Sequence, residues 1–453
     1  MMSESAGVSL DWHWLAARGW LAAQLGSLVF VLVCLGISGR IFLDLQAGRH
    51  GLGTPDYAGF YTAAIILNEH EAGRLYDLEL QDRILHARVP GVRSDEHYPF
   101  AHAPAVAFVL RPLARLPFAW SYAVWLAILA VITCTGLALC RSLVAWPADK
   151  TRGAMLLAAA FPPLAMECWL AGQWAVIGLF WLAVSLRLVR DGRWFAGGFA
   201  LALCAVKPTL LMFVLPMLFL SGRPRLLAGT VVGGVALVAI CLLAVGWDGA
   251  RAYWDLLTVY GRTMSAGAPS FKTFKHVDLH SFFVLLSGGP GWLPKAAVLA
   301  AAAGFVPWLL AAWRVPAGQG GDRQLLALCA TLTGNMVFSA YTPIYDVSLL
   351  IPNLLVTGDA LERRRHGPGN RRPNFAFLLL AALVVGSAWV TQVTARLYGL
   401  QPLTVVLLSL ACCQVTWALR EPLSAGTPRA ACRLASAVRP VQSGMVSGAE
   451  PSS

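Results

Sequence analysis

The stretch WFAGGFALALCAVKPTLLMFVLPMLFL, residues 194–220, decides the fold of this chain. Lys207 is its one charged residue, and about 20 consecutive apolar residues are needed to cross a bilayer as a helix. Proline disfavours the helical conformation at the residue before it, so Lys207-Pro208 predicts a break halfway along. We therefore expect residues 195–220 to form two short half-helices that enter the membrane and return to the side they left; a single span with Lys207 at mid-bilayer is the alternative.

Similar apolar runs flank this stretch on both sides. Of the 453 residues, 57% are hydrophobic and 13% are charged, whereas soluble domains carry about 25% charged residues. The expected spans are 20–39, 119–140, 153–170, 174–189, 226–246, 293–313, 324–340, 345–358, 374–393 and 402–419. The sequence therefore predicts an all-α polytopic membrane protein of about 10–13 transmembrane or half-membrane helices.

The basic residues explain the net charge of +12 and set the expected topology. They gather in short connections, above all in 363–372, whereas the long interval 40–118 is nearly neutral, which is the positive-inside pattern. We expect 40–118 and a second loop, 247–280, to face outward, and the termini to face the cytoplasm. Residues 1–420 would form the membrane domain and 421–453 a disordered cytoplasmic tail. This placement of charge argues against nucleic-acid binding.

The chemistry-bearing residue types show no metal-site or disulfide pattern. The ten cysteines lie mostly in apolar runs and none is spaced as C-x-x-C, so they are interpreted as small core residues. No cluster of acidic ligands and no G-x-G-x-x-G fingerprint occurs. We expect neither a metal nor another cofactor.

Lys207 and Asp346 are the least ordinary ionisable residues within the apolar segments. Charges there usually face a cavity or a partner and mark function. A structural ion pair, or side chains that reach the interface, remain alternatives.

A third candidate is Asp56, in the stretch GTPDYAGFYTAA. A Pro-Asp pair in a loop is usually a turn or a helix cap. The tyrosines at 57 and 61, however, would lie one helical turn apart beside it. A carboxylate in aromatic surroundings suits general-base work on a sugar hydroxyl.

These motifs, in their order, resemble glycosyltransferase family 87, a family of polytopic GT-C enzymes. The stretches that carry the resemblance are PDYAGFYTAA with GRLYD, HAPAVAFVLRPLARLPFAWSYAVW, GQWAVIGLFWLAVSLRLVRDGRWFAGGFALALCAVKP and TPIYDVSLLIP, between about residues 53 and 355. The chain departs from the family pattern at Trp174, where Asn is common, at Ala103-Pro104 in place of a double proline, and at Thr209. These departures bear on substrate identity more than on reaction class.

The resemblance implies a GT-C-like bundle with a long first outer loop, in the inner (plasma) membrane, with its active site facing outward. It implies inverting transfer of a hexose, mannose foremost, from a polyprenyl-phosphate sugar to an envelope glycolipid or glycan. Asp56 would be the catalytic base, and Lys207, or a nearby cation such as Lys275, would balance the phosphate charge. The remaining substrate-binding candidates are Tyr57, Tyr61, Gln173, His280 and Asp346.

Two other functions remain open from the sequence. A transporter of small molecules or lipids fits a broken helix with a charge at mid-membrane, although no matching second break is visible. A catalytically inactive GT-C-like assembly protein fits the departures from the family pattern.

Overall fold

The structure is a computed structural model that describes residues 12–49, 51–204, 207–265, 272–314, 321–363 and 375–420. The tail expected at 421–453 lies outside these residues. Within them the chain is helical and forms no strand, as expected for an all-α protein. The α-helices are α1 Trp12–Gln46, α2 Tyr57–Glu69, α3 Leu78–Arg88, α4 Pro104–Leu110, α5 Phe118–Ser142, α6 Ala148–Ala159, α7 Ala175–Arg190, α8 Trp194–Leu203, α9 Val214–Leu220, α10 Pro224–Ser265, α11 Leu279–Leu286, α12 Trp292–Trp313, α13 Gly321–Phe338, α14 Leu350–Arg363, α15 Phe375–Tyr398 and α16 Pro402–Leu419. Short 3-10 helices are η1 Ala72–Arg74, η2 Leu113–Arg115, η4 Pro208–Leu211, η5 Thr273–Lys275 and η6 Ile344–Leu349, and η3 Pro163–Leu170 is a π-helix.

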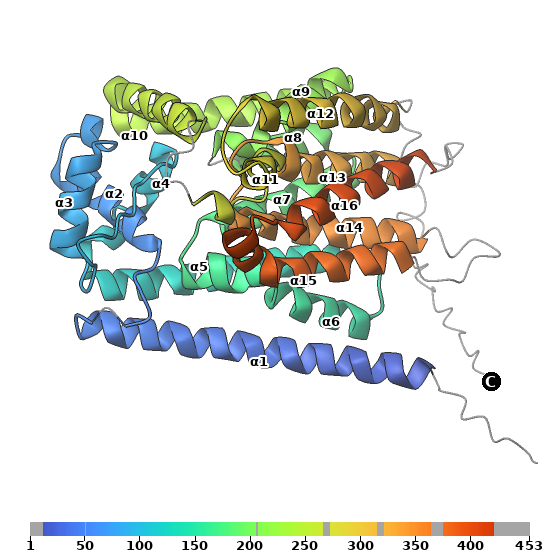
Figure 1. Cartoon of the computed structure of the whole chain (residues 1–453), viewed down its shortest axis with the longest axis horizontal. Helices are drawn as coiled ribbons and strands as arrows, with labels where there is room; N and C mark the ends of the chain where they lie inside the picture. The colour runs from blue at the N-terminus through green and yellow to red at the C-terminus, as the bar shows by residue number, and fades with distance from the viewer. Residues whose placement is uncertain are drawn as a thin grey trace, which may run out of the picture.

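The long helices lie side by side as a bundle (Figure 1). In the described part of the chain, seven helices are long and apolar enough to cross a membrane, or eight if α6 and η3, bent by 47° at Pro162-Pro163, count as one span. Large apolar side chains on these helices stay exposed, for example Val131 at 67%, Leu243 at 88% and Leu299 at 70%. Such outward-facing apolar surface is stable against lipid, and it confirms a polytopic membrane protein.

The interval 40–118 is mostly helical. α1 continues to Gln46, and α2, α3 and α4 then form a lobe at one end of the bundle (Figure 1). Asp77 starts α3 as a side-chain cap, accepting a hydrogen bond from the backbone N–H of Leu80 at 3.0 Å. This lobe positions the start of α2, where Asp56 lies.

The segment 247–280, expected as a second outer loop, is helical in its first part. After a break at Gly246, whose φ is 67°, the helical conformation of α10 continues to Ser265. The continuation packs on the lobe, since the rings of Tyr253 and Tyr76 stack at 5.2 Å. Tertiary contact thus stabilises a helix that the local sequence does not predict.

The stretch 194–220 folds as the expected hairpin. A Cβ on Gly198 in α8 would lie 2.1 Å from the carbonyl oxygen of Leu226, and one on Gly229 in α10 would lie 1.9 Å from that of Phe195. The starts of α8 and α10 therefore lie together and run in parallel, so the chain must return through η4 and α9 between them. Glycine is needed at this contact because the two backbones touch.

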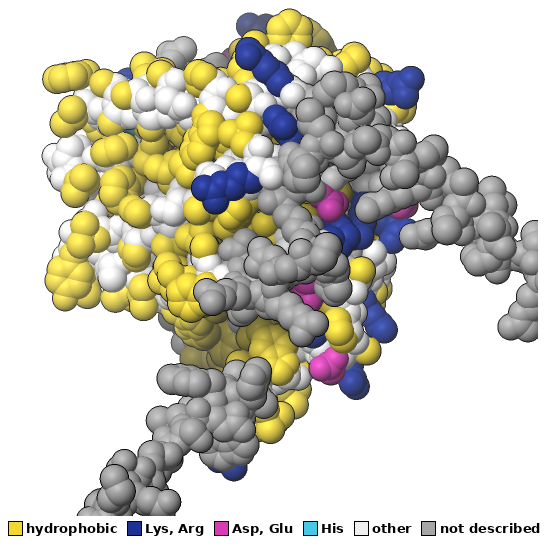
Figure 2. Space-filling view, turned by 90° about the vertical axis from the view of Figure 1, so that its right-hand side faces the viewer, with side chains coloured by type: hydrophobic (Ala, Val, Ile, Leu, Met, Phe, Trp, Pro, Cys, Tyr) yellow, Lys and Arg dark blue, Asp and Glu magenta, His cyan; other side chains and the backbone are white. Residues whose placement is uncertain are grey.

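Charged side chains gather at the end of the bundle away from the lobe, the face toward the viewer in Figure 2. Asp359 of α14 is 1% exposed there, pairs with Arg190 at 3.2 Å and with Arg363, and accepts from the backbone N–H of Ala145 at 2.7 Å. Arg363 also pairs with Asp322 at 2.6 Å. This network fastens α7, α13 and α14 to the connection after α5.

Candidate functional site

Asp56 precedes α2 but does not cap it with its side chain. Its backbone is already right-handed helical, with φ −57° and ψ −19°, and its carboxylate makes no hydrogen bond to the helix N-terminus. Instead, Oδ2 accepts a hydrogen bond from Nε2 of Gln173 at 2.7 Å. The helix-cap interpretation of Asp56 is therefore wrong, and the carboxylate is held from a distant part of the chain.

The turn Gly172-Gln173 holds this geometry. Gly172 has φ +73°, and a Cβ on it would lie 2.9 Å from Cβ of Tyr57, so a side chain there is both strained and obstructed. Trp125 donates to the carbonyl oxygen of Gly172 at 2.8 Å, and the backbone N–H of Tyr57 donates to that of Ala171 at 2.9 Å. These contacts therefore join the turn to the start of α2.

The two tyrosines after Asp56 belong to the packing of the lobe. Tyr57 is 0% exposed, shares a hydrogen bond with Ser121 at 2.8 Å and stacks on Trp125 with ring centroids 5.9 Å apart. Tyr61 is 5% exposed and donates to the carbonyl oxygen of Leu116 at 2.8 Å. In this conformation both hydroxyls are used by the protein, and Tyr57 presents no open ring face for a sugar.

Lys207 and Asp346 are brought together from the tip of the hairpin and from η6. Nζ of Lys207 donates to the hydroxyl of Tyr345 at 2.7 Å and lies 3.4 Å from Oδ2 of Asp346. The Lys207 side chain is 15% exposed and that of Asp346 is 2% exposed. Lys207 also interacts electrostatically with Asp56. A pair with this exposure keeps one charge accessible to a ligand.

The segment 273–281 docks beside this pair. Its backbone bridges antiparallel to Pro343 through His276, and Asp278 both caps α11 at the N–H of Ser281, 2.9 Å, and accepts from the N–H of Thr342 at 3.1 Å. The ring of His280 lies 6.5 Å from that of Tyr341, which has an unusual φ of 59°.

The same segment carries Lys275, half-buried in η5. Burial lowers the pKa of His276 below its usual value; Asp278 opposes this shift, and the positive charges of Lys207 and Lys275 add to it. Both lysine charges therefore act on His276.

Buried polar atoms without a partner mark the same region. Both ring nitrogens of His102, Oε1 of Gln173 and Nε1 of Trp174 are buried and have no hydrogen-bond partner among the described residues. More than about 90% of buried polar groups in proteins are hydrogen-bonded, so such orphans need explanation. A polar ligand beside Asp56 and Gln173 would supply the missing partners.

Sequence reasoning missed His102 and Trp174 as site residues. Burial, followed by the charge of Lys207, holds the pKa of His102 well below its ordinary value, so the ring is neutral. It packs against Phe60 with centroids 4.8 Å apart. His102 stands just before Ala103-Pro104, and Trp174 stands just after the Gly-Gln pair. These positions within the motifs are the signals that could have identified the two residues.

Glu167 is a second carboxylate that the sequence analysis did not single out. It lies in η3, a π-helix, a conformation that is frequent at functional sites. It accepts a hydrogen bond from Gln392 of α15 at 2.7 Å. Its neighbour Cys168 donates to the carbonyl oxygen of Tyr345 at 3.4 Å, which ties η3 to η6. Among the described residues, no group of three or more His, Cys, Asp or Glu side chains could hold a metal ion.

Comparison with known proteins identifies one family. The model of glycosyltransferase family 87 matches residues 100–340, more than half of the chain. The matched range contains Gln173, Lys207 and His280, while Asp56 and Asp346 lie outside it. No curated protein and no solved structure matches the chain.

Proposed function

Because the chain belongs to glycosyltransferase family 87, we propose that this membrane glycosyltransferase transfers a hexose, mannose foremost, from a polyprenyl-phosphate donor to an envelope glycolipid or glycan. The observation that carries the proposal is the environment of Asp56. Its carboxylate is free of the helix, is held by Gln173 at 2.7 Å, and lies beside buried polar atoms that lack partners. A sugar hydroxyl is the kind of ligand that fits.

In the proposed reaction Asp56 accepts the proton of an acceptor hydroxyl. The acceptor oxygen attacks the anomeric carbon from the face opposite the phosphate, and the bond from that carbon to the phosphate oxygen breaks. The electron pair leaves with the lipid phosphate, so the configuration at the anomeric carbon inverts. Gln173 orients the carboxylate toward the acceptor.

Lys207 is the group proposed to balance the charge that develops on the phosphate. A fixed cation placed where negative charge appears lowers the barrier without having to reorganise. Tyr345 and Asp346 hold Nζ of Lys207 in place, and Lys275 and His280 would complete the phosphate and sugar contacts. Tyr57 and Tyr61 are assigned to supporting α2.

We further propose that the lobe and the site face away from the cytoplasm in a multi-pass plasma-membrane protein. The support is the end of the bundle away from the lobe, where Lys and Arg side chains gather in Figure 2. A lipid-linked donor would then meet the site at the outer leaflet. The domain division proposed here is 1–420 in the membrane and 421–453 as a tail.

The test compares Asp56→Asn with Asp255→Asn in purified, lipid-reconstituted protein. Asp255 is an exposed carboxylate in the part of α10 that follows Gly246, and it serves as the matched control. Labelled polyprenyl-phosphate mannose is the donor, and a lipid extract of the producing cell supplies acceptors. General-base assistance is worth about 10²–10⁴-fold, so label transfer in a single turnover should fall by that factor for Asp56→Asn alone.

The outcome also separates the two functions left open by the sequence. An inactive assembly protein would show no transfer above background even in its unaltered form. If the unaltered protein is active and Asp56→Asn keeps its full rate, Asp56 is not the catalytic base. Family membership argues against a transporter. Uptake of the donor into sealed vesicles without sugar transfer would instead support the transporter function.

A further inference from the structure

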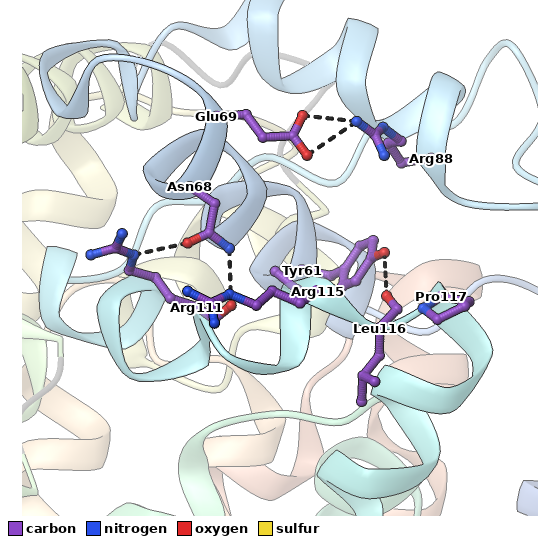
Figure 3. A pocket seen from close by; sticks show the side chains of 9 residues that line it. Tyr61, Asn68, Glu69, Arg88, Arg111, Arg115, Leu116 and Pro117 are labelled. Atoms are coloured by element: carbon purple, nitrogen blue, oxygen red, sulfur yellow. Dashed lines mark hydrogen bonds and ion pairs between the residues drawn. The ribbon is translucent and has the colours of Figure 1, made fainter.

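A cavity lies in the lobe, among the residues labelled in Figure 3. Its volume is about 430 Å³, and it is lined by side chains of α2, α3 and the PLARLP segment before α5. Asn68, at the far end of α2, follows Asp56 by twelve residues, which places it roughly 18 Å away along the helix axis at 1.5 Å per residue. The hydrogen bond from Tyr61 to Leu116 closes the wall nearest the start of α2. The cavity is therefore distinct from the candidate active site.

The lining is basic. Its charged groups are the guanidiniums of Arg88, Arg111 and Arg115 and the single carboxylate of Glu69. Glu69 is already engaged, since Arg88 donates to both of its oxygens at 2.8 and 3.1 Å. The charges of Arg111 and Arg115 thus remain uncompensated within the cavity.

Two of these guanidiniums have donor nitrogens available to an anion. Asn68 makes two hydrogen bonds to Arg111. Oδ1 of Asn68 accepts from Nε of Arg111 at 2.9 Å, and Nδ2 of Asn68 donates to the backbone oxygen of Arg111 at 2.9 Å. The terminal nitrogens of Arg111 are left for a ligand, and the guanidinium of Arg115 forms no hydrogen bond or ion pair with any residue that the structure describes. Planar guanidinium groups match phosphate geometry in a bidentate manner.

The cavity lies beside the start of a candidate membrane span. Pro117 in its wall directly precedes α5, a candidate span. Trp120, in the first turn of α5, is 53% exposed and contacts Phe42 of α1 at 5.1 Å between ring centroids, as interfacial aromatic residues do. Val109 is 59% exposed, and Phe108, under the guanidinium of Arg111, is 41% exposed. Apolar surface thus continues from the basic cavity toward the lipid.

We propose that this cavity binds the phosphate headgroup of an anionic membrane phospholipid, with Arg111 and Arg115 as donors and the acyl chains along Val109 and Trp120. The combination of two uncompensated guanidiniums with adjoining exposed apolar side chains fits a lipid phosphate better than a soluble anion. The occupant anchors the lobe to the adjacent membrane leaflet. This site uses none of the residues proposed for catalysis and stands independently of the proposed function.

The test measures phospholipid binding to full-length protein in detergent by native mass spectrometry, with phosphatidylglycerol compared with phosphatidylcholine. The Arg111→Gln/Arg115→Gln variant is compared with Arg83→Gln, which removes an exposed arginine of α3 outside the cavity. Each basic residue at an anionic surface contributes roughly fivefold, so the double variant should bind phosphatidylglycerol about 25-fold more weakly. Arg83→Gln should bind it normally.

A second arm adds glycerophosphoglycerol and inorganic phosphate as soluble competitors. If either displaces phosphatidylglycerol at micromolar concentration, the site is a soluble-anion site and the lipid assignment is overturned. Equal binding of both phospholipids, or equal loss in the Arg83→Gln control, overturns the cavity assignment. Thermal unfolding of each variant shows whether the lobe remains folded, and Asn68→Ala, which frees Arg111 without removing charge, should weaken binding by a smaller factor.

Discussion

Gln173→Ala is the substitution that tests most directly how the active site is held. It removes the donor that lies 2.7 Å from the carboxylate of Asp56 and leaves the carboxylate itself in place. Hydrogen bonds to charged groups are worth about 1.5–3 kcal/mol. If the whole of that interaction serves to orient the base, the rate of sugar transfer should fall about 10–150-fold at 1.36 kcal/mol per tenfold.

The assay is single-turnover transfer from polyprenyl-phosphate mannose, with Gln81→Ala as the control. Gln81 is also buried, at 4% exposure, but it donates to the carbonyl oxygen of Leu75 and accepts from the N–H of Phe100 inside the lobe. Its loss should lower the melting temperature and leave the rate of the folded protein unchanged. Gln173→Ala should lower the rate more than the melting temperature, because Oε1 has no partner and the one side-chain hydrogen bond lost is that to the base, Asp56.

A double-mutant cycle decides whether Gln173 acts through Asp56. In the Asp56→Asn background, Gln173→Ala should change the rate by less than about twofold, since the group it orients is gone. Independent, multiplicative effects of the two substitutions would refute the reasoning and would assign Gln173 to the substrate directly.

Three further predictions follow from the geometry. Gly172→Ala should lower both melting temperature and rate, since its φ of +73° and the contact with Tyr57 leave no room for a methyl group; an unchanged protein would mean the turn is loose. Protein stability should fall as the pH drops below 6.5, the ordinary pKa of histidine, because the folded state lowers the pKa of His102 and the unfolded chain therefore binds the proton more readily. In His102→Phe, the melting temperature should fall less steeply as the pH is lowered. Lys207→Met should lower the melting temperature by leaving Asp346 buried and unpaired, and adding Asp346→Asn should restore stability but not transfer; restored transfer would assign the pair to structure.

The sequence predicted those parts of the fold that depend on hydrophobic length and on proline. The span expected at 402–419 coincides with α16, which begins at Pro402 and ends before Arg420. The break at Lys207-Pro208 and the return of the chain were also predicted. The helix over 247–265 was not, since it is stabilised by the contact of Tyr253 with Tyr76, far away in sequence.

The candidate site was predictable as a set of residues but not as an arrangement. Asp56, Gln173, Lys207 and Asp346 were nominated from short motifs. Their pairings join positions 117 and 139 residues apart, which no local pattern encodes. His102 was missed because a lone histidine before a helix is uninformative until burial leaves both of its nitrogens without partners.

The hairpin with Lys207 at its tip has a consequence for how the protein is made. Because its arms, α8 and α9, are too short to cross the membrane, the stretch cannot be inserted as an ordinary span; it must fold in against α7 and α10. Its counter-ion, Asp346, is synthesised 139 residues later, roughly 10–30 s at bacterial and eukaryotic elongation rates. Until then Lys207 cannot pair with Asp346. Ribosome stalling or truncation inside this interval should therefore yield chains that the cell's membrane quality-control proteases recognise and remove.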